Sequence, residues 1–182
     1  FAAQPGVRYS LLQPKKYFNV NVIGFQNLLR GLEKKKIKGI IYASSSSVYG
    51  DQKKFPVSEK APLKAKNPYG LSKIINEQTA DIYSNIINIP IIGLRLFTVY
   101  GEWGRPDMYI IKLLNKIYKK QKFQLNNSGN HYRDFTHISD VVNVCYNFSI
   151  YKNKNQHTIF NVCSGKTVNM KLLTNNIKKI YP

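Results

Sequence analysis

The sequence predicts an α/β protein built around a parallel β-sheet, and three observations support this fold class. Short apolar runs alternate along the chain with longer segments of helical periodicity, as in proteins whose parallel strands are joined by helices. The apolar runs, such as "KGIIYASSSS" and "NIPIIGLRLF", contain consecutive β-branched residues, which is typical of strands buried on both faces. Polar residues follow each run abruptly, at the position where an open parallel sheet binds its ligands.

In the first half of the chain, the patterns predict a helix, a strand, a loop and a second helix. Pro14 opens a helical pattern that extends to about residue 33. Its apolar face contains Phe18, Val22, Phe25, Leu28, Leu29 and Leu32. The strand "KGIIYASSSS" follows, and residues 51–66, rich in Lys and Pro without a clear period, indicate a loop. Pro68 lies in the first turn of a helix to about residue 86, with Asn67 as its cap.

The second half of the chain continues the alternation. "NIPIIGLRLF" is the next buried strand, "MYIIKLLNKIYKK" is an amphipathic helix and "KFQL" is a short strand. "SDVVNVCYNFSIY" is a helix capped by Ser139, "TIFNV" is a strand and "NMKLLTNNIKKIY" is a last helix. The 182 residues are enough for one well-buried domain, and a hydrophobic content of 43% is ordinary for a globular protein.

Composition argues against several classes of protein. A formal charge of +19 would suit a nucleic-acid binder, but the lysines are spread along the chain and no zinc-finger, homeodomain or RNA-recognition signature is present. The lysine run at 34–36 lies between a predicted helix and strand, where a solvated end explains it. No run is long enough to cross a bilayer. Cys145 and Cys163 lie in apolar segments, so we expect buried thiols in a reducing compartment, with no metal site.

Three segments follow predicted strands and are the candidate ligand-binding segments: Ser44 to Ser47, Thr98 to Arg105, and the residues after Val162. A run of serines alone is most simply a polar turn. Tyr69 and Lys73 share one helix face, although that spacing alone is compatible with a chance pair. The combination is more specific, because the hydroxyl cluster precedes the Tyr-x-x-x-Lys helix start with a loop between them.

These motifs resemble those of the extended short-chain dehydrogenase/reductase superfamily. "YASSSSVYG", "NPYGLSK" and "RDFTHISD" carry the resemblance, and "GLRLFTVYGEWGRPDM" is similar to the UDP-glucuronate 4-epimerases of the NAD-dependent epimerase/dehydratase family. The resemblance implies a Rossmann-like doubly wound sheet that lacks its first strands here, with part of a small C-terminal substrate-binding subdomain. Residues 1–105 would be the remainder of the NAD-binding domain, and residues 106–182 a mixed region that contributes to the sugar-nucleotide subdomain and returns to the sheet.

The resemblance also implies a chemistry for the motif residues. Tyr69 would be the general base that takes the proton of the sugar 4-hydroxyl, and Lys73 would lower its pKa and hold the nicotinamide ribose. Ser45 would hydrogen-bond the same hydroxyl, with Ser46 and Ser47 as possible substitutes. The hydride of C4 would pass to NAD and return to the other face of the 4-keto sugar.

Further residues are carried over from the family more loosely. The expected cofactor contacts are Ala2, Ala3, Asn21, Ala43, Ser44 and Phe97, together with Tyr69 and Lys73. Asn21 is equally compatible with a polar residue on a helix face. The expected substrate contacts are Ser45, Ser46, Thr98, Arg105 and Arg133. Arg105 would hold the uronate carboxylate, or alternatively shape its own loop through Asp107. Arg133 would pair with the diphosphate, or alternatively be a solvated surface charge.

The serine turn argues against two neighbouring chemistries of this superfamily. Related 4,6-dehydratases carry Asp and Glu where Ser46 and Ser47 stand, and UDP-xylose-forming decarboxylases carry Glu at Ser47. A hydroxyl is a poor acid or base at neutral pH. Three alternatives stay open: another NAD-dependent nucleotide-sugar epimerase or dehydratase, a catalytically inactive relative that binds nucleotide sugars, and a nucleic-acid binder.

The resemblance finally implies how the intact protein is organised. The glycine fingerprint of the cofactor site is absent, and the chain begins at "FAAQPGV" without an initiating Met, so we expect a fragment of a longer protein. The two helices at 14–33 and 68–86 would form a homodimer, although their second apolar faces, including Ile74, Ile75 and Ile82, could equally be core. We expect a cytoplasmic enzyme of carbohydrate metabolism, serving polysaccharide biosynthesis, with a UDP-sugar substrate and no nucleic-acid partner.

Overall fold

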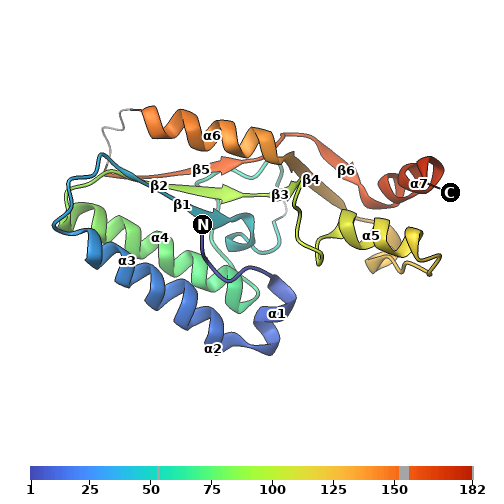
Figure 1. Cartoon of the computed structure of the whole chain (residues 1–182), viewed down its shortest axis with the longest axis horizontal. Helices are drawn as coiled ribbons and strands as arrows, with labels where there is room; N and C mark the ends of the chain where they lie inside the picture. Colours follow the sequence, from blue (N-terminus) through green and yellow to red (C-terminus); the bar gives the residue numbers. More distant parts are fainter. Residues whose placement is uncertain (53, 152–155, 182) are drawn as a thin grey trace. The chain divides into compact units, whose positions relative to one another are not determined.

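The computed structural model describes residues 1–52, 54–151 and 156–181, and the chain forms two compact units (Figure 1). The first unit contains Phe1–Leu96 and Val144–Val162, and the second contains Phe97–Asn143 and Cys163–Pro182. The functional division that the sequence predicts at residue 105 stays a prediction, because compactness does not assign functions to either part.

A parallel sheet of three strands forms the centre of the first unit. The strands are β1 (Ile40–Ser45), β2 (Ile91–Leu96) and β5 (His157–Val162). Their order is β1-β2-β5, and both pairings are parallel. β2, in the middle, is buried from Ile91 to Arg95, as its run of apolar residues predicts. The predicted α/β class with a parallel sheet is therefore confirmed.

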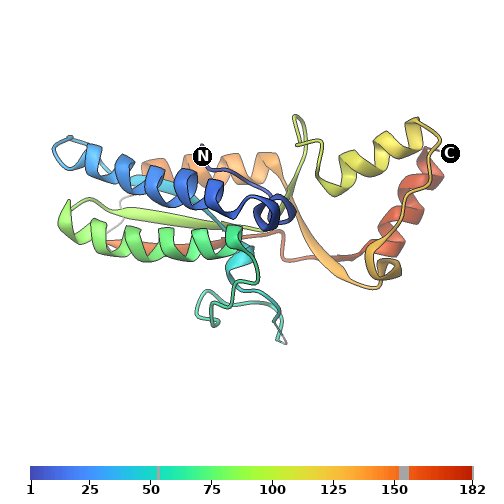
Figure 2. The same cartoon turned by 90° about the horizontal axis from the view of Figure 1, so that it is seen from below.

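Helices cover one face of this sheet. They are α1 (Val7–Leu12), α2 (Pro14–Tyr17), the π-helical segment η1 (Phe18–Ile23), α3 (Gly24–Leu32) and α4 (Pro68–Ile86). The segments from α2 to α3 follow one another without a break, which confirms the predicted long helix, whereas α1 was not predicted. Asn67 caps α4 as expected, because its Oδ1 accepts a bond of 2.8 Å from the Gly70 N–H. Figures 1 and 2 show α3 and α4 side by side.

The core of the first unit lies between these helices and the sheet. Leu29 of α3, Tyr42 of β1, Ala80 of α4 and Ile91 of β2 form one buried cluster. The end of α6 (Ile138–Ile150) covers the opposite face, where Phe148 stacks on Phe160 of β5 with ring centroids 4.7 Å apart (Figure 1). Helices on both faces make the sheet doubly wound, in agreement with the prediction.

The second unit has a small sheet of its own. Its elements are β3 (Thr98–Tyr100), α5 (Tyr109–Tyr118), the short helix η3 (Asn126–Gly129), β4 (Tyr132–His137), β6 (Thr167–Asn169) and α7 (Met170–Ile180). β4 pairs in parallel with β3 and antiparallel with β6. α5 and α7, both predicted, contribute buried Leu113 and Met170. Across the described ranges, no helix has the length and apolar character that a membrane span requires.

Four local predictions were wrong. "KFQL" has no regular secondary structure, and Lys122 and Gln124 are exposed there, so no sheet edge pairs with it. α6 begins one residue before Ser139, and the Ser139 N–H donates to His137 Nδ1 at 3.3 Å, so the histidine caps the helix instead. Cys163 is exposed because β5 ends one residue earlier, at Val162. Cys145 is only partly buried, although burial still raises the pKa of its thiol.

Candidate active site

The predicted serine cluster is a packed turn at the end of β1. Ser45 ends the strand, and the single helical turn η2 (Ser46–Val48) follows. The Oγ of Ser45 accepts a bond of 3.2 Å from the Ser47 N–H, so this side chain caps the turn. Ser44 and Ser45 are buried, with 2% and 7% exposure, and Ser46 is half-buried. The hydroxyls therefore belong to a fixed structure and not to a solvated loop.

The start of α4 lies directly against this turn, and a glycine makes the approach possible. A Cβ at Gly70 would lie 2.6 Å from the Ser47 carbonyl oxygen and 3.1 Å from the Ala65 Cβ. Only a hydrogen atom fits in that space. Tyr69 precedes Gly70, so the same contact brings the backbone of the predicted base beside the serine turn. The position of its phenol oxygen relative to Ser45 stays a prediction.

Tyr69 and Lys73 form the pair that their spacing predicts. The Lys73 Nζ lies 5.9 Å from the centroid of the Tyr69 ring and donates to the Ala43 carbonyl at 2.8 Å. Lys73 is only 3% exposed, and this burial lowers its pKa to about 8, against the opposing attraction of Glu77. The Tyr69 ring packs edge-on against Tyr17, with centroids 6.1 Å apart. A buried ammonium beside a phenol favours the phenolate.

Asn21 is a buried clamp between the start of the chain and α4. It lies in the π-helical segment, is 1% exposed, and its Oδ1 accepts a bond of 2.7 Å from the Gln4 N–H. Its Nδ2 donates to Ser72 Oγ and to the Gln4 carbonyl, each at 3.1 Å. Asn21 is therefore neither a solvent-exposed residue on a helix face nor a side chain without hydrogen-bond partners. Ala2 and Ala3, which precede the clamped residue, are exposed and half-exposed.

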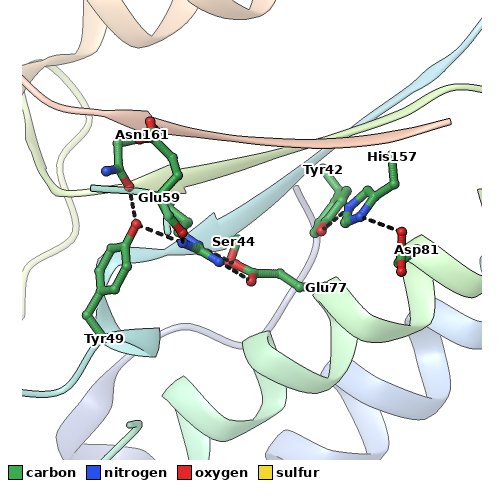
Figure 3. A network of polar contacts seen from close by, with 9 residues as sticks. Tyr42, Ser44, Tyr49, Glu59, Glu77, Asp81, His157 and Asn161 are labelled. Carbon is green, nitrogen blue, oxygen red and sulfur yellow. Dashed lines mark hydrogen bonds and ion pairs between the residues drawn. The ribbon is translucent and has the colours of Figure 1, made fainter. Parts of the chain in front are cut away.

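A buried ion pair beside the serine turn was missed by sequence reasoning. Arg95 Nε and Nη2 donate to the two carboxylate oxygens of Glu77 at 2.9 and 2.7 Å. The side chains of Arg95 and Glu77 are only 5% and 6% exposed. Ser44 Oγ donates to the same carboxylate at 2.5 Å (Figure 3). A signal was available, because an arginine inside the apolar run "IIGLRLF" needs a buried partner.

Arg95 keeps its charge despite the burial. Burial opposes the charge of Arg95, but hydrogen bonds from its guanidinium to Glu77 and Tyr49 raise the arginine pKa further above its usual value. Burial raises the pKa of Tyr49, against the effect of Arg95, so its hydroxyl stays protonated. Arg95 therefore remains a cation and Tyr49 a hydrogen-bond donor throughout the neutral pH range.

The remaining predicted site residues belong to the second unit. Phe97 and Thr98 are half-buried at its start. Arg105 bonds to Asp107 through Nε at 2.9 Å and Nη2 at 3.0 Å. Arg133 is exposed and donates weakly to the Tyr132 carbonyl at 3.4 Å. Among the described residues, no cluster of three or more His, Cys, Asp or Glu side chains could hold a metal ion.

Comparison with known proteins assigns the family. The model of the NAD dependent epimerase/dehydratase family matches residues 1–163. The chain belongs to this family. The Protein CapI of Staphylococcus aureus is 46% identical over 145 residues, which cover 78% of this chain and 42% of that protein. UDP-glucuronate 4-epimerase 4 of Arabidopsis thaliana is 42% identical over 151 residues, which cover 79% of this chain and 34% of that protein.

A solved structure is also similar to this epimerase/dehydratase-family chain. The UDP-glucuronic acid 4-epimerase from Bacillus cereus, in complex with UDP-glucuronic acid and NAD, is 30% identical with a TM-score of 0.89. The match covers 98% of this chain and 58% of that one. The chain thus spans between a third and three-fifths of the length of these three relatives.

A second polar cluster in this chain crosses the central sheet. Tyr42 of β1 and His157 of β5 join through the tyrosine hydroxyl and Nε2 at 3.1 Å, and Asp81 lies 3.5 Å from the other ring nitrogen (Figure 3). Gly93 of β2 lies beneath the tyrosine, and a Cβ there would be 2.6 Å from its hydroxyl oxygen. Burial lowers the pKa of His157, which Asp81 partly opposes. This cluster therefore ties strands together with a neutral histidine.

Proposed function

We propose that the complete protein containing these residues is a nucleotide-sugar 4-epimerase that interconverts UDP-glucuronate and UDP-galacturonate. The observation that carries the proposal is the Tyr69–Lys73 pair, held by Lys73 and Gly70 against the serine turn. Relatives named UDP-glucuronate 4-epimerase support the substrate. Polysaccharide biosynthesis in the cytoplasm is the setting that this reaction suggests.

Each residue has a role that follows from its surroundings. Tyr69 takes the proton of the sugar 4-hydroxyl, because the buried charge of Lys73 favours its phenolate. Ser45 donates to the same sugar oxygen, since its Oγ already accepts from the turn and its own hydrogen stays available. Ser46 is half-buried beside it and is the substitute donor. Tyr69 would return the proton to the O4 oxygen, whereas the configuration at C4 would depend on which face of the keto sugar lies toward the nicotinamide when the hydride returns.

The residues present fit a nicotinamide nucleotide. The buried ammonium of Lys73 has three N–H donors and would gain acceptors from ribose hydroxyls, which would offset the cost of its burial. Small or flat side chains suit a cofactor, and Ala2, Ala3, Ala43 and Phe97 are residues of this kind. Asn21 holds the backbone of Gln4, which follows Ala2 and Ala3. Ser44 could contribute through its backbone, since its hydroxyl is bonded to Glu77. NAD, when bound, supplies a reversible hydride acceptor for the sugar C4.

The direct test uses the complete gene product, supplied with NAD and UDP-glucuronate, and follows UDP-galacturonate by chromatography. We expect conversion by the wild type and a loss of about 100-fold or more for Tyr69→Phe, which keeps the ring but removes the acid-base group. UDP-glucose is the parallel substrate. Absence of conversion, or a fully active Tyr69→Phe, would contradict the proposal.

The Arg105–Asp107 pair favours a second candidate, an epimerase for a neutral sugar. A guanidinium already bonded twice to its own loop has less to offer a carboxylate. Under the first proposal, Thr98 and Arg105 hold the uronate and Arg133 the diphosphate. Arg105→Met should then raise KM for UDP-glucuronate, while Asp107→Asn, which frees the arginine, should not. A neutral-sugar enzyme would show the same KM in both variants and prefer UDP-glucose.

The intact protein should be a homodimer through α3 and α4. Apolar side chains with exposures of 40–63% lie on this pair of neighbouring helices and the π-helical segment: Val20, Ile23, Leu28, Leu71, Ile82 and Ile86. Ile74 and Ile75 are partly buried. Like residues on a second copy would cover this patch. Sedimentation of the complete protein should give a dimer that Ile82→Glu dissociates, whereas Ile180→Glu, at an exposed site on α7, should leave it intact. A wild-type monomer at micromolar concentration would exclude this interface.

A further inference from the structure

One polar residue on each strand of the central sheet lies in the same row. The strand register pairs Ser44 of β1 with Arg95 of β2, and Arg95 with Asn161 of β5. Residues paired in register point to the same face of a sheet. The row crosses the sheet close to its carboxyl end, one residue before Ser45. Polar side chains in a buried sheet need hydrogen-bond partners, and those partners determine which elements the row holds together.

Hydrogen bonds join the row into one network (Figure 3). Ser44 and Arg95 both donate to Glu77 of α4. Arg95 Nη1 donates to the Tyr49 hydroxyl at 2.7 Å, and that hydroxyl donates to Asn161 Oδ1 at 2.6 Å. The network therefore links Ser44 of β1 through Glu77 of α4 to Arg95 of β2. From Arg95 it continues through Tyr49, the residue after the serine turn, and ends at Asn161 of β5.

The loop between the serine turn and α4 is held by the same network. Arg95 Nη1 also donates to the Glu59 carbonyl at 2.9 Å, and Asn161 Nδ2 donates to the Val57 carbonyl at 2.8 Å. The Asn161 N–H donates to Glu59 Oε1 at 2.9 Å. Val57 and Glu59, in the loop that connects the two segments, are thus fixed to β2 and β5.

Two of the bonds attach the end of β1 to α4 one helical turn apart. Lys73 Nζ holds the Ala43 carbonyl at 2.8 Å, and Glu77 holds the neighbouring Ser44 hydroxyl at 2.5 Å. A slide of the strand along the helix would break both bonds. Glu77 also attracts the charge of Lys73 and so raises its pKa against the effect of burial.

We propose that Ser44, Glu77 and Arg95 are positioning residues for the reaction. They fix the end of β1, which carries Ser45, in register with α4, which carries Tyr69 and Lys73. The inference rests on the proposed function, and none of the three residues needs to touch the substrate. Its prediction is specific: weakening the Ser44–Glu77 bond lowers the rate of the chemical step without changing the affinity for the nucleotide sugar.

Ser44→Ala in the complete protein is the sharpest test, because it removes one neutral hydroxyl and leaves the Glu77–Arg95 pair whole. Removing either charge would leave its partner buried and unpaired, which unfolds many proteins. We expect kcat to fall about tenfold with unchanged KM, since misplacement by a fraction of an ångström weakens a proton transfer. Tyr49→Phe, at the other end of the network, should lower kcat in the same direction by less.

Ser84→Ala is the matched control. Ser84 is also fully buried and lies on α4, but its hydroxyl bonds, among the described residues, to the Asp81 carbonyl of its own helix at 2.7 Å. This variant should keep the wild-type kcat. A second readout is amide hydrogen exchange over residues 43–50, which Ser44→Ala should accelerate and Ser84→Ala should not.

The outcomes separate this inference from the proposed function. If the wild type does not convert UDP-glucuronate, the proposed function fails, and exchange alone decides whether Ser44 holds the turn. If Ser44→Ala and Tyr49→Phe both keep the wild-type kcat, the positioning role is refuted, even when exchange is faster. A rise in KM with constant kcat, or equal exchange in Ser44→Ala and Ser84→Ala, also overturns it.

Discussion

Replacing Lys73 by methionine should stabilise the fold while abolishing activity. Lys73 is 3% exposed, and its pKa falls from 10.5 to about 8, mainly through burial. The folded protein therefore holds the lysine proton less tightly than the unfolded chain does. Methionine fills a similar volume, carries no charge and suits an irregular apolar site.

The size of the effect follows from the pKa difference. At about 1.4 kcal/mol for each pKa unit, the charged lysine costs the folded state roughly 3 kcal/mol at pH 7. The lost bond to the Ala43 carbonyl offsets about 1 kcal/mol of the gain. Lys73→Met should thus be more stable than the wild type by about 2 kcal/mol at neutral pH.

The pH dependence gives the prediction its sign. Between the folded pKa of about 8 and the unfolded value of 10.5, the unfolded wild type binds more protons, so wild-type stability rises with pH. Lys73→Met lacks this rise. Its advantage should shrink through that window, and well above the unfolded pKa of 10.5 the wild type should be more stable by the value of its hydrogen bond.

Urea unfolding of the complete protein without nucleotide, at pH 7 and at pH 10, measures the difference. Lys38→Met, at an exposed lysine just before β1, is the control and should change stability little at either pH. A Lys73→Met protein that is less stable at pH 7, or a difference that does not depend on pH, would refute the reasoning.

Three further predictions concern the close contacts and the histidine. Gly70→Ala places a Cβ 2.6 Å from the Ser47 carbonyl oxygen, so it should push the serine turn from α4, lower kcat at least tenfold and destabilise the fold in urea, because the contact is with backbone; wild-type kcat would contradict this contact. Gly93→Ala places a Cβ 2.6 Å from the Tyr42 hydroxyl and should destabilise the fold by about 2 kcal/mol, measured by thermal unfolding, with no loss expected if the tyrosine can move aside freely. Burial lowers the pKa of His157, so the folded state binds its proton less tightly and stability should fall as pH drops below about 6.5. His157→Gln should remove that acid-dependent part in urea titrations from pH 7 to pH 5, and an unchanged slope would assign the loss to other groups.

Periodicity and caps were enough to predict the framework of the first unit. The β-branched runs around Ile40 and Ile91 are buried strands, and Asn67 and Pro68 mark the start of α4, because these signals act between neighbouring residues. "KFQL" failed because a short apolar run becomes a strand only beside a free sheet edge. β4 was missed because "YRDFTH" carries charges that the pairing with β3 and β6 accommodates.

The site was predictable only where its residues share a motif. Tyr69 and Lys73 lie one turn apart, so their proximity follows from the helix alone. Arg95 and Glu77 lie in different elements, and the sequence shows only that a charge inside a buried strand needs a partner. Which carboxylate supplies it depends on how α4 crosses the sheet, and local patterns do not encode that crossing.

The helix geometry of α4 explains why one residue of its polar stripe is partly accessible and two are buried. Residues four apart on an α-helix differ by about 40° in direction, so Lys73 and Glu77 are turned by about 40° and 80° from Tyr69. Tyr69 is accordingly half-buried, whereas Lys73 is 3% and Glu77 5% exposed. The stripe thus rotates from the half-buried Tyr69, through an ammonium at the end of β1, to a carboxylate that bonds the sheet. The proposed base Tyr69 and the buried Glu77 can therefore share one helix face although they differ in exposure. Moving the carboxylate to position 76 would turn it away from Arg95, and the network would lose its ion pair.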